Sequence, residues 1–177
     1  MVAGTTRTIL ERRSECAIGQ NVGMTEHVSV SKDIAATPSA VWALVTELAR
    51  MGEWSPEATG GKWVGGATGP ALGAKFKGTN SNGKKRWSTD ATVTKFDIDR
   101  TFAFDVKGGG LKVAAWTYTI EPTDGGCRVT ESWDDPRGAA MKFIGKAVSG
   151  VADRASHNRA GMETTLNNLA TALATTS

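Results

Sequence analysis

Residues 101–135 read TFAFDVKGGGLKVAAWTYTIEPTDGGCRVTESWDD, and their pattern indicates the fold class. Apolar and polar residues alternate through three segments, at 101–107, 111–121 and 127–134, which is typical of strands with one buried face. Glycine-rich turns separate these segments. Short turns join antiparallel neighbours, so this stretch predicts an antiparallel meander.

The meander extends toward the N-terminus. Two more strands are predicted at 74–80 and 84–96, because the Asn82-Gly83 pair between them is a strong hairpin signal. A short strand is predicted at 62–65, and alternation indicates a first strand at 27–34.

Between the first strand and the meander the sequence predicts one or two short helices. Thr37 is suited to cap the first helix and Pro38 to occupy its first turn. The Trp54-Ser55-Pro56 segment ends this helical region, because proline disfavours helix at the residue before it.

After residue 136 the spacing of apolar residues changes to three and four. This spacing predicts one long amphipathic helix of about nine turns to the end of the chain. Helices segregated from the strands in this way define an α+β domain. The apolar positions of the helix are Met141, Ile144, Val148, Val151, Ala155, Met162, Leu166, Leu169 and Leu173.

Bulk properties set the broad class. With 177 residues the chain suits one domain, predicted at 24–177. Residues 1–23 show no clear period and are predicted to be a disordered or non-native tail, with Met24 as a possible true start; a short amphipathic helix over Thr8–Cys16 is the alternative. Two cysteines argue against a disulfide framework and favour a reducing, cytoplasmic location.

Several classes of partner are not expected. A net charge of +3, with only Lys84-Lys85-Arg86 clustered, does not favour nucleic acid. The apolar runs are too short for stable membrane insertion. The two histidines have no ligands at metal-binding spacing, so neither a metal nor another cofactor is predicted. A monomer and a homodimer both stay open.

The ordered series of motifs resembles the START-like, or Bet v 1-like, superfamily (SRPBCC), and within it the bacterial polyketide cyclase/dehydrase and lipid-transport branch. The resemblance covers Met24 to about Leu173, and it is closest to actinobacterial members. The motifs that carry it are Thr37-Pro38, Val41-Trp42, Trp54-Ser55-Pro56, Gly73-Ala74-Lys75-Phe76, Trp116-Thr117-Tyr118, Glu121-Pro122, Gly125-Gly126, Thr130-Glu131-Ser132, and Gly161-Met162 with Leu166 and Leu169.

The resemblance implies a helix-grip fold, in which a curved sheet and the long C-terminal helix enclose a cavity for a hydrophobic small molecule. Its members bind or carry lipids and polyketides, and some cyclise or dehydrate the bound ligand. A few are described as toxins of toxin–antitoxin pairs, which leaves a regulatory role as a third alternative. Because one fold hosts several functions, the resemblance does not decide among them.

Strand alternation assigns side chains to the inner face of the sheet. Glu131 falls among apolar and aromatic neighbours there, and a buried charge needs a partner or a raised pKa. Arg159 shares the predicted apolar stripe of the helix, so we expect a Glu131–Arg159 pair inside the cavity. The alternatives are a Glu131 at the cavity mouth in water or an Arg159 that reaches the surface. In an enzyme, Glu131 would act as general acid or base and Tyr118 as proton donor or oxyanion partner.

Other residues are candidates for the cavity wall because they are apolar or aromatic and lie on a predicted inner face, while Trp54, in the loop after the short helices, is a candidate for the pocket rim. Indoles on a sheet are also common in ordinary cores. Together with Tyr118, Glu131 and Arg159, the predicted ligand-binding residues are Trp54, Phe76, Trp87, Phe104, Trp116, Trp133, Val148, Ala155 and Met162.

Overall fold

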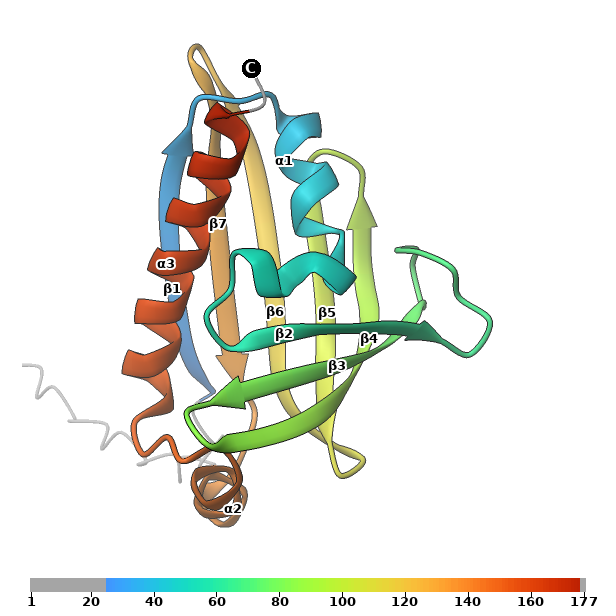
Figure 1. Ribbon diagram of the computed structural model, residues 1–177, viewed down its shortest axis with the longest axis vertical. Coiled ribbons are helices and arrows are strands. Elements are labelled where there is room, and N and C mark those ends of the chain that lie inside the picture. The colour runs from blue at the N-terminus through green and yellow to red at the C-terminus, as the bar shows by residue number, and fades with distance from the viewer. Residues whose placement is uncertain (1–24, 176–177) are drawn as a thin grey trace, which may run out of the picture.

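The computed structural model describes residues 25–175, so the predictions made for residues 1–23 lie outside the described residues. A curved antiparallel sheet of seven strands forms the body of the domain, and helices cover its concave side (Figure 1). The strands are β1 (Glu26–Ile34), β2 (Ala58–Val64), β3 (Lys75–Asn82), β4 (Lys85–Asp97), β5 (Thr101–Gly108), β6 (Leu111–Thr123) and β7 (Gly126–Asp135).

The sheet order is β1-β7-β6-β5-β4-β3-β2, so the last strand pairs with the first. The predicted meander from β3 to β7 is confirmed, and three of its four turns contain glycine, the exception being the β4–β5 turn at residues 98–100. Gly83 begins the β3–β4 turn at a φ of 55°, a left-handed conformation that favours glycine. β2 is longer than the predicted 62–65 segment.

Two short helices follow β1, as predicted: α1 (Pro38–Val45) and the 3-10 helix η1 (Leu48–Glu53). The Thr37 side chain accepts a hydrogen bond from the Ala40 backbone N–H, and Pro38 lies in the first turn. Trp42 of α1 is buried in the core against Phe96 and Phe102.

The prediction of one continuous C-terminal helix is wrong. The chain forms α2 (Ala139–Ser149) and, after a break, α3 (Arg154–Ala174). Gly150 ends α2 at a φ of 74°, and its N–H donates to the Lys146 carbonyl. Asp153 then caps α3 by accepting from the Ser156 N–H.

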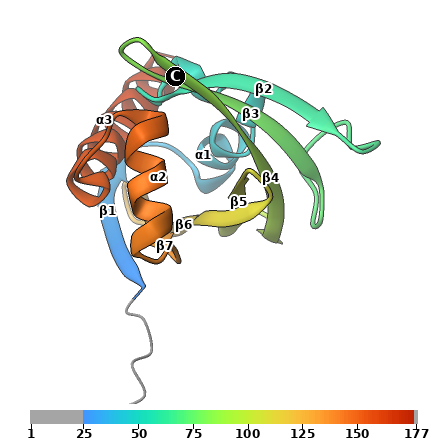
Figure 2. The same ribbon diagram turned by 90° about the horizontal axis from the view of Figure 1, so that it is seen from below.

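The break places the two helices at different parts of the sheet. α3 packs mainly along β1, whereas α2 contacts β4 and lies across the lower end of the molecule, as Figure 2 shows from below. Two hydrogen bonds join α2 to the β3–β4 hairpin: Asn82 Nδ2 donates to the Ser149 carbonyl and Lys85 Nζ to the Ala147 carbonyl.

The core fills only part of the concave side. Its larger cluster lies between α1, α3 and the sheet, and includes the fully buried Val41, Phe102 and Leu169. A smaller cluster around Trp133 and Met162 lies further along β6 and β7. Between residues 25 and 175, no helix has the length and apolar character needed to cross a membrane.

Candidate functional site

A cavity of about 460 Å³ lies between the concave face of the sheet, η1 and the two C-terminal helices. Its volume is within the range of roughly 300–1,000 Å³ typical of small-molecule sites. Strands β3 to β7 contribute most of its wall, and α2 contributes Met141, Ile144 and Val148. The long helix α3 therefore covers only part of the concave face of the sheet, and the cavity lies beside it.

Aromatic side chains dominate the wall, and strand register explains why they meet. Phe104 is paired with Trp116, which in turn is paired with Trp133, so three rings share one face across β5, β6 and β7. Phe76 and Trp87 add rings from β3 and β4. The structure thus places these five predicted residues on one concave wall, as strand alternation indicated.

Glu131 is the charged group set deepest in this wall. The residue is 4% exposed, and its Oε1 accepts a hydrogen bond of 2.8 Å from the Tyr118 hydroxyl, its cross-strand neighbour. Its Oε2 is buried and has no hydrogen-bond partner within residues 25–175. Native proteins rarely leave such an atom unsatisfied, so Oε2 is available to a bound molecule.

The environment of this pair changes its acid–base chemistry. Burial raises the pKa of Glu131 to about 7, and the hydrogen bond from Tyr118 only partly opposes this rise. Burial and the nearby Glu131 charge both raise the pKa of the Tyr118 hydroxyl. Glu131 can therefore hold or release a proton near neutral pH, while Tyr118 stays protonated.

The predicted Glu131–Arg159 pair is wrong. Arg159 is exposed on the outer side of α3, where its Nη1 lies 3.5 Å from the Ser29 carbonyl oxygen. Asn158 and Arg159 lie four and three residues before Met162, so both fit the apolar stripe by spacing. In α3 Asn158 is buried and lines the cavity, whereas Arg159 is exposed.

The remaining predicted residues divide between the cavity and the core. Val148 lines the cavity from α2 and is 46% exposed. Met162 is buried in the core and Ala155 packs against the same cluster, but neither lines the cavity. Trp54 is also buried, outside the cavity, where its indole N–H donates to the Met51 sulfur.

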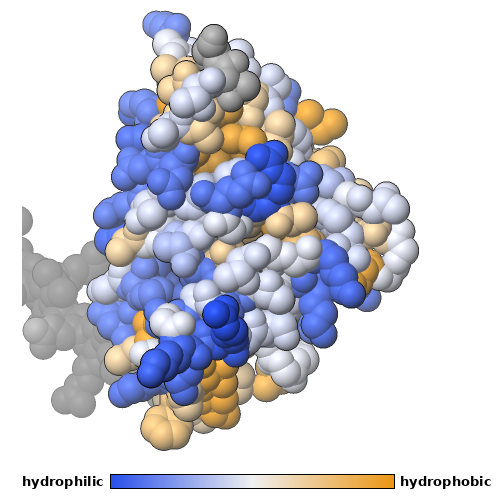
Figure 3. Space-filling model, in the orientation of Figure 1, coloured by the Kyte–Doolittle hydropathy of each residue, from blue (hydrophilic) through white to orange (hydrophobic). Residues whose placement is uncertain are grey.

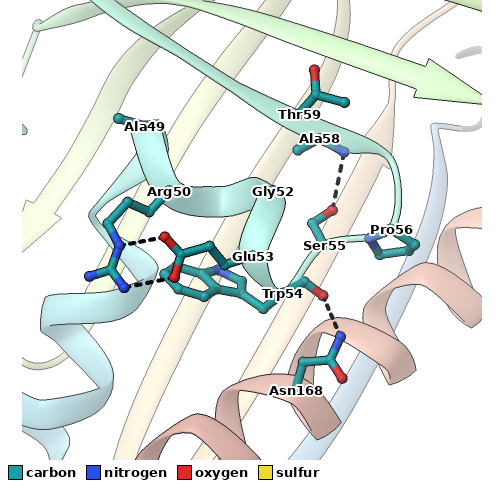
Figure 4. Close-up of a pocket in the computed structure, with 10 residues that line it drawn as sticks. All are labelled: Ala49, Arg50, Gly52, Glu53, Trp54, Ser55, Pro56, Ala58, Thr59 and Asn168. Atoms are coloured by element: carbon teal, nitrogen blue, oxygen red, sulfur yellow. Dashed lines mark hydrogen bonds and ion pairs between the residues drawn. The ribbon is translucent and has the colours of Figure 1, made fainter.

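Trp54 instead borders a shallow surface depression beside η1, shown in Figure 4. The Arg50–Glu53 ion pair lies at its edge, and Asn168 of α3 donates to the Trp54 carbonyl. Both members of the ion pair are more than half exposed. The depression is open and its polar groups already have partners, so it offers less to a ligand than the cavity does.

A second polar group in the cavity wall was missed from the sequence. Glu57, at the start of β2, accepts from Arg154 Nη1 at 2.8 and 2.9 Å and binds His157 Nε2 at 2.7 Å. This contact holds His157 at the cavity wall. The Arg154 guanidinium also lies over the Trp87 ring, 6.0 Å from its centroid.

A third polar group joins β7 to the start of α2. The Asp135 side chain is 1% exposed, and Arg137 Nε and Nη2 each donate to it at 2.8 Å. Burial alone would raise the pKa of Asp135, but hydrogen bonds from the Arg137 side chain and backbone outweigh it and hold this pKa below its usual value. Arg137 also lines the cavity.

For Arg154 and His157, the break between α2 and α3 was the signal present in the sequence. Gly150 followed by Asp153 has the pattern of a helix C-terminus and a new N-cap. A helix started at Arg154 places His157 and Asn158 on the inner side. Glu57 gives no such signal, because it is a loop residue just before β2 and contacts residues about 100 positions away.

In the described residues, no cluster of three or more His, Cys, Asp or Glu is arranged to hold a metal ion.

Apolar side chains continue from the cavity onto the surface of α2. Phe143 and Ile144 are 75% and 52% exposed. Figure 3 shows hydrophobic surface at this lower end of the molecule. α2 thus carries apolar side chains both on the cavity wall and on the surface of the protein.

An α+β domain with a curved sheet, a C-terminal helix across it and an aromatic cavity between them is a helix-grip protein. Residues 25–174 match the family described as polyketide cyclase/dehydrase and lipid transport, and the chain belongs to this Bet v 1-like family. No curated protein matches the sequence.

Solved structures agree with this assignment. A Polyketide_cyc-like protein from Corynebacterium glutamicum, Cgl2372, is 28% identical, with 86% of this chain and 91% of that one covered and a TM-score of 0.55. Protein MLL2253 from Mesorhizobium loti shares the fold at 18% identity, with 86% and 99% covered and a TM-score of 0.60.

The fold also matches half of a larger protein. StfQ, a di-domain ARO/CYC protein from the steffimycin biosynthetic pathway, has a TM-score of 0.62 at 12% identity. The match covers 84% of this chain and 50% of that one. At this identity the likeness concerns the fold alone.

Proposed function

We propose that the protein binds or carries a hydrophobic small molecule, such as a lipid or polyketide, in the cavity between the sheet and the C-terminal helices. The observation that carries this proposal is the unpartnered Glu131 Oε2 in a wall of aromatic rings. An apolar ligand would remove the exposed ring surface from water, and a polar group on it would satisfy the carboxyl group. The family description supports the same ligand class.

Extraction of the purified protein tests the proposal. The protein is denatured in organic solvent, and released small molecules are identified by mass spectrometry. We expect a stoichiometric apolar compound. A protein that yields none, and that takes up none of a panel of lipids and aromatic polyketides, would not have the proposed function.

Filling the cavity should abolish uptake without unfolding the protein. Gly78 lies on the cavity wall, and a Cβ there would meet only side-chain atoms of Thr89 and Phe76, at 3.4 Å or more. Gly78→Leu therefore projects a side chain into the cavity, and we expect at least about a ten-fold loss of extracted ligand, since ligand and side chain compete for one space.

The matched control for this change is Lys77→Leu, the next residue on the same strand, which is exposed on the opposite face. It should retain the ligand. Equal ligand content in the Gly78→Leu and Lys77→Leu proteins would place the binding site elsewhere.

One observation favours catalysis as a second candidate function. A carboxyl group with a pKa of about 7 beside a tyrosine hydroxyl suits general acid–base chemistry at neutral pH. We propose that, in a cyclase or dehydratase, Glu131 would transfer the proton and Tyr118 would stabilise the developing oxyanion. Turnover of an offered polyketide should then fall about 100-fold or more in Glu131→Gln, while ligand retention persists; unchanged turnover would exclude this role.

The cytoplasmic location and the monomeric or homodimeric state expected from the sequence stay predictions. Gel filtration with light scattering would measure the oligomeric state.

A further inference from the structure

The charges around the cavity are already paired among themselves. Two arginines line it, and each binds a carboxylate: Arg154 binds Glu57, and Arg137 binds Asp135 through two nitrogens. No lysine belongs to the cavity wall among residues 25–175. A ligand anion would therefore meet no free cation in this part of the chain.

Among the side-chain atoms of residues 25–175 that are fully shielded from solvent, Glu131 Oε2 has no hydrogen-bond partner, and it offers no positive charge to an anion. Glu131 Oε2 is buried, and when Tyr118 donates to Oε1 the carboxyl proton resides on Oε2. In that state Oε2 is a donor that lacks an acceptor. In the ionised state the same oxygen would repel a carboxylate or phosphate, at short range and away from water.

We infer that the cavity selects uncharged ligands that present a carbonyl-type acceptor oxygen to Glu131 Oε2, and that it rejects fatty-acid and phospholipid anions. This inference rests on the proposed function and narrows its ligand class. A ligand lacking the acceptor is also disfavoured, because it would leave the buried donor unsatisfied. Specificity thus comes from one required hydrogen bond and from the absence of a counter-ion.

Three probes of nearly equal shape separate these effects: acetylnaphthalene, naphthoate and isopropylnaphthalene, substituted at the same ring position. Acetylnaphthalene presents a neutral acceptor, naphthoate presents an anion, and isopropylnaphthalene presents no acceptor. Their binding is measured by isothermal titration calorimetry at about pH 6, where Glu131 is mostly protonated and naphthoate is ionised. Tyr118, Glu57, Arg137, Arg154 and His157 are the other charged or titratable groups lining the cavity.

We expect acetylnaphthalene to bind at least about ten-fold more tightly than either of the other probes. Isopropylnaphthalene leaves the carboxyl donor unsatisfied, and naphthoate must give up the hydration of its charge without meeting a free cation. Glu131→Gln keeps a donor in this place, since its amide can donate to the ligand while its carbonyl accepts from Tyr118. This variant should retain the preference for the ketone. Because Glu131→Ala alone would free the Tyr118 hydroxyl to donate to a ligand, the donor is removed with the double variant Glu131→Ala/Tyr118→Phe. This double variant should bind the ketone and the isopropyl compound equally.

The outcomes distinguish the inference from the proposed function. Naphthoate or isopropylnaphthalene binding as tightly as the ketone would overturn the inference while leaving an apolar binding site in place. Loss of the preference in Glu131→Gln would overturn it too, and circular dichroism of each variant establishes that it is folded. If none of the three probes binds the native protein, the proposed function itself fails.

Discussion

Replacing Glu131 with Gln should stabilise the protein above neutral pH and leave its stability unchanged below about pH 4.5. Burial raises the pKa of this carboxyl group from 4.5 to about 7 in the folded state. As the pH rises through this interval, the unfolded chain releases a proton that the folded protein retains, so the free energy of unfolding falls. At about 1.4 kcal/mol per pH unit, the loss is about 3 kcal/mol above pH 7. Gln carries no charge and avoids this loss.

Urea unfolding between about pH 4 and pH 8 measures the effect as a difference in the free energy of unfolding between the variant and the native protein. Glu121→Gln on the same strand pair is the matched control, because this residue is exposed and its substitution should leave the pH profile unchanged. A Glu131→Gln protein less stable than the native one at pH 8 would show that the carboxylate has a partner in solution. Greater stability without the carboxyl group would mean that Glu131 serves binding or catalysis at the expense of the fold.

The second large change in stability is expected when Arg137 is replaced by Met. Arg137→Met leaves Asp135 buried with only Lys142, whose Nζ lies 3.7 Å from Oδ2, as a charged partner. Breaking a buried ion pair on one side costs roughly 3–5 kcal/mol, because the remaining charge is poorly compensated. We expect a loss of about 3 kcal/mol in the free energy of unfolding near pH 7. The loss should shrink as the pH falls and Asp135 takes up a proton.

Two comparisons isolate the buried charge as the cause. The double variant Asp135→Asn/Arg137→Met should recover most of the lost stability, since it removes both charges. Arg128→Met breaks a pair with Asp33 of similar geometry but with both side chains more than half exposed, and should change stability little. Equal losses at Arg128 and Arg137 would show that burial is not the deciding factor.

Local signals in the sequence were sufficient for most of the fold. The strands of the meander were predicted to within a few residues because each is bounded by turn residues, such as Gly83 before β4 and Gly109 before β6. Likewise, Thr37 and Pro38 marked the start of α1. These features depend on neighbours in the chain, which is why a single sequence reveals them.

The C-terminal helix shows where local patterns fail. An apolar period of three and four residues continues across Gly150, although the backbone there leaves the helical conformation. Periodicity records which residues are apolar, and it cannot show whether the hydrogen bonds between them continue. The apolar positions of α3 from Met162 to Leu173 are buried as predicted. The errors therefore concern the continuity of the helix and the choice between the neighbours Asn158 and Arg159, which both lie about one turn before Met162.

The candidate site was predictable in its wall but not in its ion pairs. Alternation placed Glu131 and Tyr118 on the concave face, and cross-strand register then made them neighbours. Contacts such as Glu57 with Arg154 depend on how the sheet curves and where α3 begins. Such long-range geometry leaves no mark in the sequence at either residue.

The aromatic wall of the cavity has a practical consequence. Three of the six tryptophans in the chain, Trp87, Trp116 and Trp133, line the space that a ligand would enter. Indole emission depends on the polarity around the ring, and exclusion of water shifts it toward shorter wavelength. The protein therefore carries an intrinsic fluorescent reporter of its own occupancy, and uptake can be followed without any added label.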